Sequence, residues 1–479
     1  MIRSRGPRIV WTVLAAALLG GCALGPNYTR PAGAEPPIFR GQATAEAASF
    51  ADGPWWETFQ DPALQALIQE ALRNNYDVAI AAARVQEARA SLSVARSELF
   101  PSLDYGATAG RARLPLGGLN LPTGADHRTQ DVFSATTGMS WELDIWGRVR
   151  RSNEAARATL FATEEARRGV WLTLVSDVAQ AYFQLLALDV QLQIAQHSTQ
   201  AYQGTYDLFL DRLNLGVASK LETSRALGAL GDAQAAIPQL ESDIVAKENQ
   251  ISILLGKAPG PIPRGQPMYA QPVTPAVPAG LPSALLERRP DLHQAEQELV
   301  SANARIGVAK AEFFPKFSLT ALFDTASPEV SALTVGAATI WAVAGMFSGP
   351  LFNAGRTLGT YRASIAQWEQ ARLQYEQAVL TALREVSNAL TALGKLNEAE
   401  VGQDTAVRAL ADAVELATDR YRQGLASYYE VLEAQQQLYP AQTTLAQIRR
   451  NRLLAYVQLY KALGGGWNLT DAQWTDQTR

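Results

Sequence analysis

The sequence predicts a mainly α-helical protein with a small β-strand portion, built from two copies of one unit. Three observations predict this fold class: short motifs that recur at a fixed spacing, two 68-residue stretches without proline, and a stretch in which apolar and polar residues alternate. The 479 residues are 47% hydrophobic, which is enough for a packed core and excludes disorder along the whole chain.

The repeat is visible as motif pairs. The motif at residues 99–101 recurs at 313–315, an offset of 214. Later motifs recur with an offset of 208: those at 147–148, 216–219 and 255–256. The first copy therefore has a loop six residues longer, in the stretch that includes residues 114–129. We expect a first repeat over 62–258, a proline-rich linker over 259–282 and a second repeat over 283–463.

The two proline-free stretches, 148–215 and 356–423, carry apolar residues at a seven-residue spacing, which is typical of coiled-coil packing. At 1.5 Å per residue each helix would be about 100 Å long. Glu400 and Gln403 interrupt the stripe in the second copy. Shorter helices are expected over 62–100 and 218–256, and in the second copy over 283–314, with a restart at Pro290, and over 426–463. Gly216 and Gly424 follow the long helices, where glycine favours a tight helix end, and so predict the tips of two helical hairpins.

The strands are expected between 101 and 147 and between 315 and 355. From Phe133 to Ile145 every second residue is apolar or threonine, and the residues between them are polar or glycine. Four strands are too few to close a barrel, for which about eight is the practical minimum. Several chains must therefore combine their strands if the edges are to be covered. An apolar outer face and a polar inner face suit a barrel that lies in lipid.

The N-terminus has the pattern of a secretory signal peptide over residues 1–21: Arg3, Arg5 and Arg8 precede a short apolar run. Residues 19–22 resemble a bacterial lipobox, in which Cys22 is lipidated, and Ala23 after it favours the outer membrane. Acyl chains of this kind anchor a protein stably. We expect a lipidated tether over 22–61 and a C-terminal tail over 464–479.

The composition and the motifs exclude several classes of protein function. The net charge of -4 gives no basic excess for nucleic acid. The lone cysteine excludes a disulfide within one chain. The sequence has no nucleophile elbow, phosphate-binding loop or histidine cluster, so we expect neither an enzyme nor a metal or other cofactor. After the first 25 residues no apolar run approaches 18 residues, so no further membrane helix is expected.

The ordered set of motifs resembles the TolC-like outer-membrane factor family, in the lipoprotein branch that serves RND-type multidrug efflux pumps. The resemblance covers about residues 28–467. The motifs that carry it are Asn27-Tyr28, Arg30-Pro31, Trp55-Trp56, residues 287–292, 313–315, 420–424 and 460–467.

This resemblance implies a homotrimer whose strands form a twelve-stranded β-barrel in the outer membrane, above a twelve-helix coiled-coil tube in the periplasm. It also implies two partners, a periplasmic adaptor protein and an inner-membrane pump, and a passive duct for drugs or other small molecules. Protein secretion, metal export and a coiled-coil lipoprotein scaffold without a channel remain alternatives.

The resemblance also assigns roles at the tips. A gate that adaptor docking opens is expected there. In the family, carboxylates at the positions of Glu222, Glu430 and Glu433 line the entrance, and Tyr421 takes part in closure. Arg420 and Arg422 are the candidate cations that pair with them. Rings of Glu430 and Glu433 would favour cations. The adaptor would contact small and apolar residues at the two turns, namely Gly216, Val217, Ala218, Ser219, Gly424, Leu425, Ala426 and Ser427.

Overall fold

The computed structural model describes residues 23–31, 36, 38–40, 55–113, 129–272, 280, 282–327, 329–334 and 339–466. The chain divides into two compact units. Unit 1 comprises Met1–Ala32, Arg84–Thr163 and Gln294–Tyr375, and unit 2 comprises Gly33–Ala83, Glu164–His293 and Glu376–Arg479. Cys22, the predicted lipidation site, lies outside the described residues.

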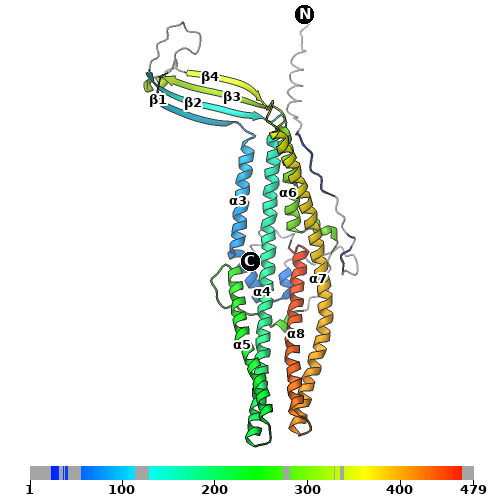
Figure 1. Cartoon of the computed structure of the whole chain (residues 1–479). Coiled ribbons are helices and arrows are strands. Elements are labelled where there is room, and N and C mark those ends of the chain that lie inside the picture. Colours follow the sequence, from blue (N-terminus) through cyan, green and yellow to red (C-terminus); the bar gives the residue numbers. More distant parts are fainter. Residues whose placement is uncertain are drawn as a thin grey trace, which may run out of the picture. The chain divides into compact units, whose positions relative to one another are not determined.

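Unit 1 contains one antiparallel sheet with the strand order β1-β2-β3-β4 (Figure 1). The strands are β1 (Ser102–Arg113), β2 (Thr129–Leu143), β3 (Lys316–Ser327) and β4 (Thr339–Ser348). Large apolar side chains stand exposed on the face that the alternation predicts: Leu103 and Tyr105 on β1, and Trp341, Val343 and Phe347 on β4. The face of the sheet predicted to meet lipid is therefore apolar and uncovered within one chain.

The register of the sheet confirms the duplication residue by residue. In the first hairpin Ser102 is opposite Ser140, and in the second Lys316 is opposite Ser348. Adding 214 to the β1 residue and 208 to the β2 residue converts one pair into the other. The same offsets relate all pairs of the two hairpins that lie in described strands, so the two copies have one strand pairing.

The helices repeat with the same two offsets. The long helices α4 (Arg148–Asn214) and α7 (Arg356–Arg422) have 67 residues each. They are followed by α5 (Lys220–Leu254) and α8 (Tyr428–Ala462), which have 35 residues each. Helices α3 (Tyr76–Ser97) and α6 (Pro290–Ala311) have 22 each and precede the strands. All residues of the predicted heptad stripes on α4 and α7 are buried or half-buried, as the coiled-coil pattern requires.

The first short helix differs from the expectation. A single helix over 62–100 was predicted, but the chain forms α2 (Pro62–Asn74) and then α3, with a break at Asn75. The Asn75 side chain accepts hydrogen bonds from the backbone N–H groups of Asp77 and Val78, and it donates one to the carbonyl of Leu254. Asparagine is a strong N-cap, so this residue ends one helix and begins the next. The predicted restart at Pro290 is confirmed, because a short 3₁₀ helix (Pro282–Glu287) precedes α6.

The main core of unit 2 surrounds the middle of α4. Fully buried aromatic side chains form its centre, with the rings of Phe59 and Phe183 4.8 Å apart. One window of α4 is long and apolar enough to cross a membrane, but 72% of it is buried inside the protein. This window serves as a core segment, which explains its hydropathy.

The two polar interruptions of the α7 stripe form contacts with α8. Glu400 pairs with Arg449, at 2.9 Å, and with Arg452. The Gln403 amide donates to the backbone carbonyl of Ala441 at 3.0 Å. Because a buried charge needs a matching partner, these residues favour one register of α7 against α8.

The N-terminal segment 23–31 is docked within unit 1. The Arg30 guanidinium binds both carboxylate oxygens of Glu296 on α6 at 2.7 Å, and the Tyr28 hydroxyl donates to the same carboxylate. Burial and the Glu296 charge raise the pKa of Tyr28. Nearer to Cys22, the Leu24 N–H donates to the carbonyl of Trp146, just after β2. The chain that follows the predicted lipid site therefore begins beside the end of the sheet.

Candidate functional site: the two hairpin tips

Each hairpin of unit 2 ends in a tight turn (Figure 1), and a glycine in the left-handed conformation lies at each turn. Gly216 has φ +74 and Gly424 has φ +76. At the first tip the N–H of Gly216 donates to the carbonyl of Leu213, and the N–H of Val217 donates to that of Arg212. The second tip repeats both bonds. This is the Schellman arrangement, which glycine favours because a side chain would be strained at this φ.

The two tips differ in how the following helix begins. Ser219 and Glu222 form a capping box at the start of α5: the Ser219 N–H donates to the Glu222 carboxylate at 2.7 Å, and the Glu222 N–H donates to the serine hydroxyl at 3.3 Å. Ser427 occupies the equivalent position before α8 but makes no side-chain capping bond. Glu222, a predicted gate carboxylate, thus also holds the first turn in shape.

An aromatic cluster joins the two hairpins just above the tips. Phe209 on α4 packs against Tyr428 on α8, with ring centroids 3.9 Å apart, and lies 6.0 Å from Tyr421 on α7. Tyr202 and Leu230 extend the cluster upward. Burial raises the pKa of Tyr202 to about 12 and also raises that of Tyr428, which reflects how well the cluster excludes water.

Arg212 on α4 links the first hairpin to the second. Its guanidinium donates a hydrogen bond to the Tyr421 hydroxyl of α7. The central guanidinium carbon, Cζ, lies 5.0 Å from the centre of the Tyr421 ring. A cation over an aromatic face is attracted by the ring quadrupole, and a hydrogen bond from a charged donor is stronger than a neutral one. Tyr421 therefore has a partner across the hairpins, and that partner is not one of the predicted cations, Arg420 and Arg422.

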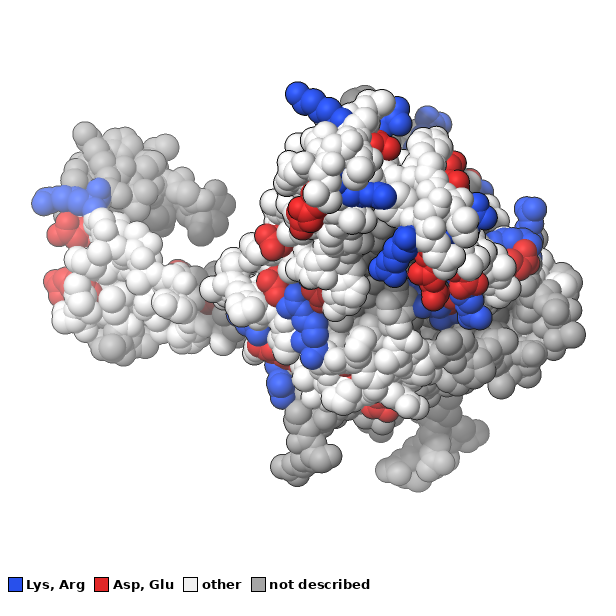
Figure 2. Space-filling view, turned by 90° about the horizontal axis from the view of Figure 1, so that it is seen from below, with Lys and Arg blue, Asp and Glu red and all other residues white. Residues whose placement is uncertain are grey.

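The predicted arginines make weaker contacts on the second hairpin. Arg420 lies 3.8 Å from the Glu430 carboxylate, and both side chains are largely exposed. Arg422 lies 3.5 Å from Asp419 on its own helix. Glu433 is exposed on α8, one turn beyond Glu430. Figure 2 shows acidic and basic side chains close together on this end of the hairpins. Exposed pairs of this kind contribute little energy, so they break easily when a partner approaches.

The tips also expose apolar side chains. Val217 is 66% exposed and Leu425, its equivalent, is 68% exposed. Leu215, Leu221 and Tyr429 lie exposed beside them. Ala218 and Ala426 are half-buried and Ser219 and Ser427 are exposed, so small side chains surround these apolar ones. A cluster of exposed apolar residues at one end of a protein is typical of an interaction surface.

An open groove lies above the tips, between α5 and α8. It has a volume of about 650 Å³ and extends from the level of Tyr202 to that of Gln191 on α4. On the α5 side its wall consists of small residues, Ala229, Ala233 and Ala236. Small residues allow another helix to approach closely, so this groove could accept a helix of a partner protein.

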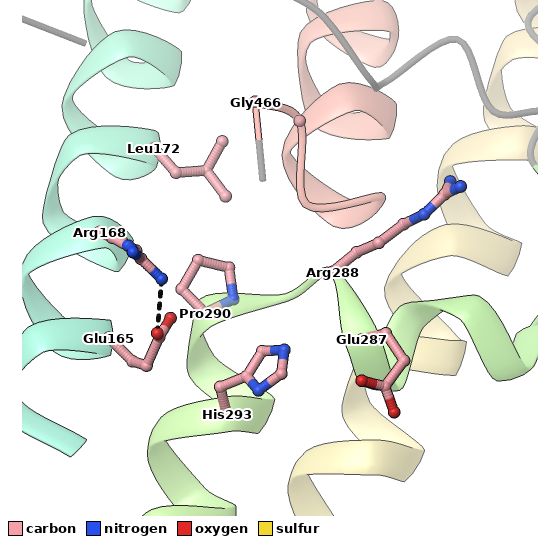
Figure 3. Close-up of a pocket in the computed structure, with 9 residues that line it drawn as sticks. Glu165, Arg168, Leu172, Glu287, Arg288, Pro290, His293 and Gly466 are labelled. Carbon is pink, nitrogen blue, oxygen red and sulfur yellow. Dashed lines mark hydrogen bonds and ion pairs between the residues drawn. The ribbon is translucent and has the colours of Figure 1, made fainter. Parts of the chain in front are cut away.

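A second hollow of about 250 Å³ lies between α4, the start of α6 and the end of α8 (Figure 3). Glu165, Arg168 and His293 line it. The Glu165 carboxylate is bound to Arg168 at 2.6 Å, so this acidic residue is neutralised by an ion pair on its own helix. Among the described residues, no three side chains are grouped as a metal ion would need.

Together, an apolar-faced sheet and long helical hairpins with exposed tips define an outer-membrane channel protein. The chain matches the outer membrane efflux protein family over residues 67–257 and 281–465. It is 36% identical to the toluene efflux pump outer membrane protein TtgC of Pseudomonas putida, over 95% of this chain and 94% of that protein. It is 35% identical to the cation efflux system protein CusC of Escherichia coli, over 94% and 97%. The outer membrane channel MtrE of Neisseria gonorrhoeae, solved in an open state, superposes with a TM-score of 0.83 at 30% identity, over 93% of this chain and 99% of that one.

The chain therefore belongs to the outer membrane efflux protein family. It is an outer-membrane channel of an efflux pump with a periplasmic helical portion, and the predicted fold class, function and location are confirmed. The relatives named here are efflux proteins and a channel rather than enzymes. The roles of the tip residues and of Cys22 stay predictions.

Proposed function

We propose that three copies of this chain form the exit duct of a tripartite efflux pump, anchored by acyl chains on Cys22. One observation carries the proposal: the described part of a single chain supplies four strands, with one exposed apolar face and two edge strands, β1 and β4. A sheet of this kind is stable in lipid only when it is closed into a barrel. Twelve strands are enough to form a closed barrel with an open lumen. The helical hairpins would then form the tube in the periplasm.

The assembly predicts a heat-modifiable protein. The full-length chain, purified in mild detergent, should migrate as a high-mass band when it is loaded without boiling, and as a single chain after boiling. The same sample should form ion-conducting channels in a lipid bilayer. A chain that remains monomeric without boiling and conducts no ions would contradict the trimeric duct.

At the tips, the proposed gate combines the Arg212–Tyr421 bond with the carboxylates of Glu222, Glu430 and Glu433. The Arg420–Glu430 contact would hold the second turn closed, and Arg422 would supply further positive charge near the entrance. When the hairpin tips of three copies converge, the carboxylates would form rings that favour cations. Each single bond is weak, so an adaptor that binds only the open arrangement needs a differential affinity of a few kcal/mol to open the gate.

The adaptor would dock on the exposed residues of the two turns and in the groove between α5 and α8. Replacement of both Val217 and Leu425 by aspartate should abolish drug efflux in cells, because two charges would be buried in the contact without partners. These side chains are about two-thirds exposed in the single chain, so the fold should tolerate the change and the trimer should persist on unboiled gels.

A matched control for this pair is Thr405→Asp with Val401→Asp, which places two charges on the exposed face of α7 away from the tips. Efflux should remain with the control variant. Efflux that survives the tip substitutions would show that the adaptor contacts another surface.

Similarity to relatives does not favour one class of cargo over another. A relative named for toluene and one named for cations are 36% and 35% identical to this chain. The described hairpins have no group of three metal-ligating side chains. We infer that the duct carries the substrates that its inner-membrane pump selects.

A further inference from the structure

A groove of about 540 Å³ lies between α7 and α8, close to the end of α8. We call it the α7–α8 groove. Two cationic side chains line it, Arg384 on α7 and Lys461 on α8, together with the amide side chains of Asn388 and Gln458. The other lining residues are one carboxylate and four alanines, namely Glu385, Ala389, Ala392, Ala455 and Ala462. The α7–α8 groove therefore combines apolar surface with positive charge.

The carboxylate of Glu385 is matched by a buried arginine. Glu385 lies 2.8 Å from the guanidinium of Arg289, a side chain that is only 8% exposed. Among the described residues, neither Arg384 nor Lys461 forms an ion pair. Asp177 on α4 is near Lys461: burial raises the pKa of Asp177, and the Lys461 charge opposes this shift. The groove thus has two positive charges to which no carboxylate is bound.

The arginine behind the groove also has a role that both repeats share. In the first repeat the Asn75 amide donates to the carbonyl of Leu254 at 2.9 Å. Arg289 and Ala462 are the equivalent residues, 214 and 208 positions later, and the guanidinium donates to the Ala462 carbonyl at 2.9 Å. The longer arginine also reaches Glu385 on α7. It therefore neutralises the one carboxylate among the lining residues, and the lining keeps its positive charge.

The first repeat shows the same place without a groove. The offset of 208 relates Ala392 to Gln184 and Ala455 to Lys247. In the first repeat the Lys247 ammonium donates to the Gln184 amide oxygen at 2.8 Å, and this bridge joins α5 to α4. Both positions are alanine in the second repeat, so the bridge is replaced by the space of the α7–α8 groove.

The two cations are likewise specific to the second repeat. Arg384 corresponds to Ser176 and Lys461 to Ile253, again by the offset of 208. Helices α5 and α8 have 35 residues each, so the helical hairpin forms in the same way without these charges. Open space and positive charge therefore occur together at one place where the shared fold requires neither. This combination indicates a negatively charged ligand.

The groove faces away from the proline-rich linker. Tyr269 of the linker packs against Arg449 on α8, with 4.7 Å between the guanidinium carbon and the ring centre. Gln458 follows Arg449 by about two and a half helical turns, so it lies on the opposite side of α8. A linker inside the tube would obstruct the duct. In the proposed trimer the linker is therefore on the outside, and the α7–α8 groove opens into the lumen.

We propose that the α7–α8 groove binds a small amphipathic organic anion as it passes through the duct. The anionic group, a carboxylate or a sulfonate, would lie between Arg384 and Lys461, and the apolar part would cover the alanines. Hydrogen bonds from charged donors to an oxyanion are stronger than neutral ones, so the two cations would supply most of the affinity. The groove lies within one chain, and only its location in the lumen rests on the proposed trimeric duct.

Fluorine NMR tests the site with three probes of similar size: para-trifluoromethyl benzoate, the neutral para-trifluoromethyl benzyl alcohol and the cationic para-trifluoromethyl benzylamine. Purified full-length protein in a neutral detergent should broaden the fluorine signal of the benzoate most, after subtraction of the broadening that empty micelles cause. The alcohol has the same ring without a charge, so it measures the apolar contact alone. The amine should bind no better than the alcohol, because two positive charges repel it.

Two double variants transfer first-repeat residues to the groove, so the fold should tolerate them. Arg384→Ser with Lys461→Ile removes both charges and should weaken benzoate binding roughly 10-fold or more, because the bonds from charged donors are lost. Ala392→Gln with Ala455→Lys rebuilds the bridge and fills the space but adds a positive charge. If the groove is the site, this variant binds benzoate more weakly. Tighter binding would show that surface charge alone attracts the probe, and it would contradict the proposal.

Arg408→Ser is the matched control, since it removes an exposed cation of α7 that pairs with Asp404 outside the groove. It should bind benzoate as the unmodified protein does. Equal binding of benzoate and alcohol, or unchanged binding in Arg384→Ser with Lys461→Ile, would overturn the anion site, and a neighbouring copy would then be the occupant of the groove. Neither result affects the high-mass band of the unboiled protein, whose absence contradicts the trimeric duct instead.

Discussion

Replacement of Tyr421 by phenylalanine should raise the conductance of the isolated channel in a lipid bilayer. The substitution removes the hydroxyl that accepts the Arg212 hydrogen bond but keeps the ring contacts with Phe209 and Tyr428. A partly exposed hydrogen bond to a charged group contributes about 1–2 kcal/mol, so its loss should increase the ratio of open to closed hairpins roughly 5- to 30-fold. Single-channel recording at fixed salt measures this ratio as open probability and mean conductance.

Arg212→Gln should have nearly the same effect, and the double variant should add little, because either substitution already breaks the bond. This non-additivity distinguishes a direct contact from two independent contributions. Arg408→Gln is the matched control: Arg408 is exposed on α7 and pairs with Asp404 of its own helix. If both tip variants conduct like the unmodified channel, the contact between the hairpins does not contribute to closure.

The periodic elements could be predicted from the sequence because their signals are long or duplicated. The predicted long helices, 148–215 and 356–423, differ from α4 and α7 by one residue at the C-terminal end. The offsets of 214 and 208 likewise reappear in the strand register. The break at Asn75 was missed because a single capping asparagine is a local signal within a region that otherwise reads as helix. Its effect depends on the contact with Leu254, 179 residues away.

The tip site could be predicted only in part. The turn glycines were found, since a positive φ has a direct sequence signal. The partner of Tyr421 was not found, because Arg212 lies 209 residues earlier and the pairing depends on how the two hairpins pack. The duplication contains a usable signal: Arg212 is four residues before one tip glycine and Tyr421 three before the other, so both lie one turn above the tips. The capping role of Glu222 also had a signal, in the Ser-x-x-Glu pattern of residues 219–222.

One carboxylate in unit 2 ties together three segments that are far apart in the sequence. Asp61 is completely buried and caps α2 by accepting hydrogen bonds from the N–H groups of Ala63 and Leu64. It also accepts from the Tyr182 hydroxyl of α4 at 2.9 Å and from the Gln271 amide of the linker at 2.8 Å. The predicted proline-rich linker is therefore connected to α4 through hydrogen bonds to the Asp61 carboxylate.

Asp61→Ala should loosen the linker strongly. The substitution removes a helix cap and leaves at least two buried donors, the Tyr182 hydroxyl and the Gln271 amide, without their acceptor. We expect a loss of about 3–5 kcal/mol in the free energy that holds the linker closed, since a buried unsatisfied group costs about 1–3 kcal/mol and a cap about 1 kcal/mol. Tryptic cleavage of the native protein at Arg264, within the linker, measures this opening, because cleavage follows the population of the open form when closing is fast.

Cleavage at Arg264 should then rise more than roughly 100-fold in Asp61→Ala. Tyr182→Phe removes the hydroxyl that donates to Asp61 and accepts from the Gly265 N–H, but it keeps the helix cap and the ring in the core, so it should produce a smaller rise than Asp61→Ala. Asp412→Ala, on the exposed face of α7, is the control for loss of a carboxylate and should leave the rate unchanged. Equal cleavage in Asp61→Ala and in the control would show that the linker is held by its apolar contacts, such as buried Ile262 and Met268, rather than by this carboxylate.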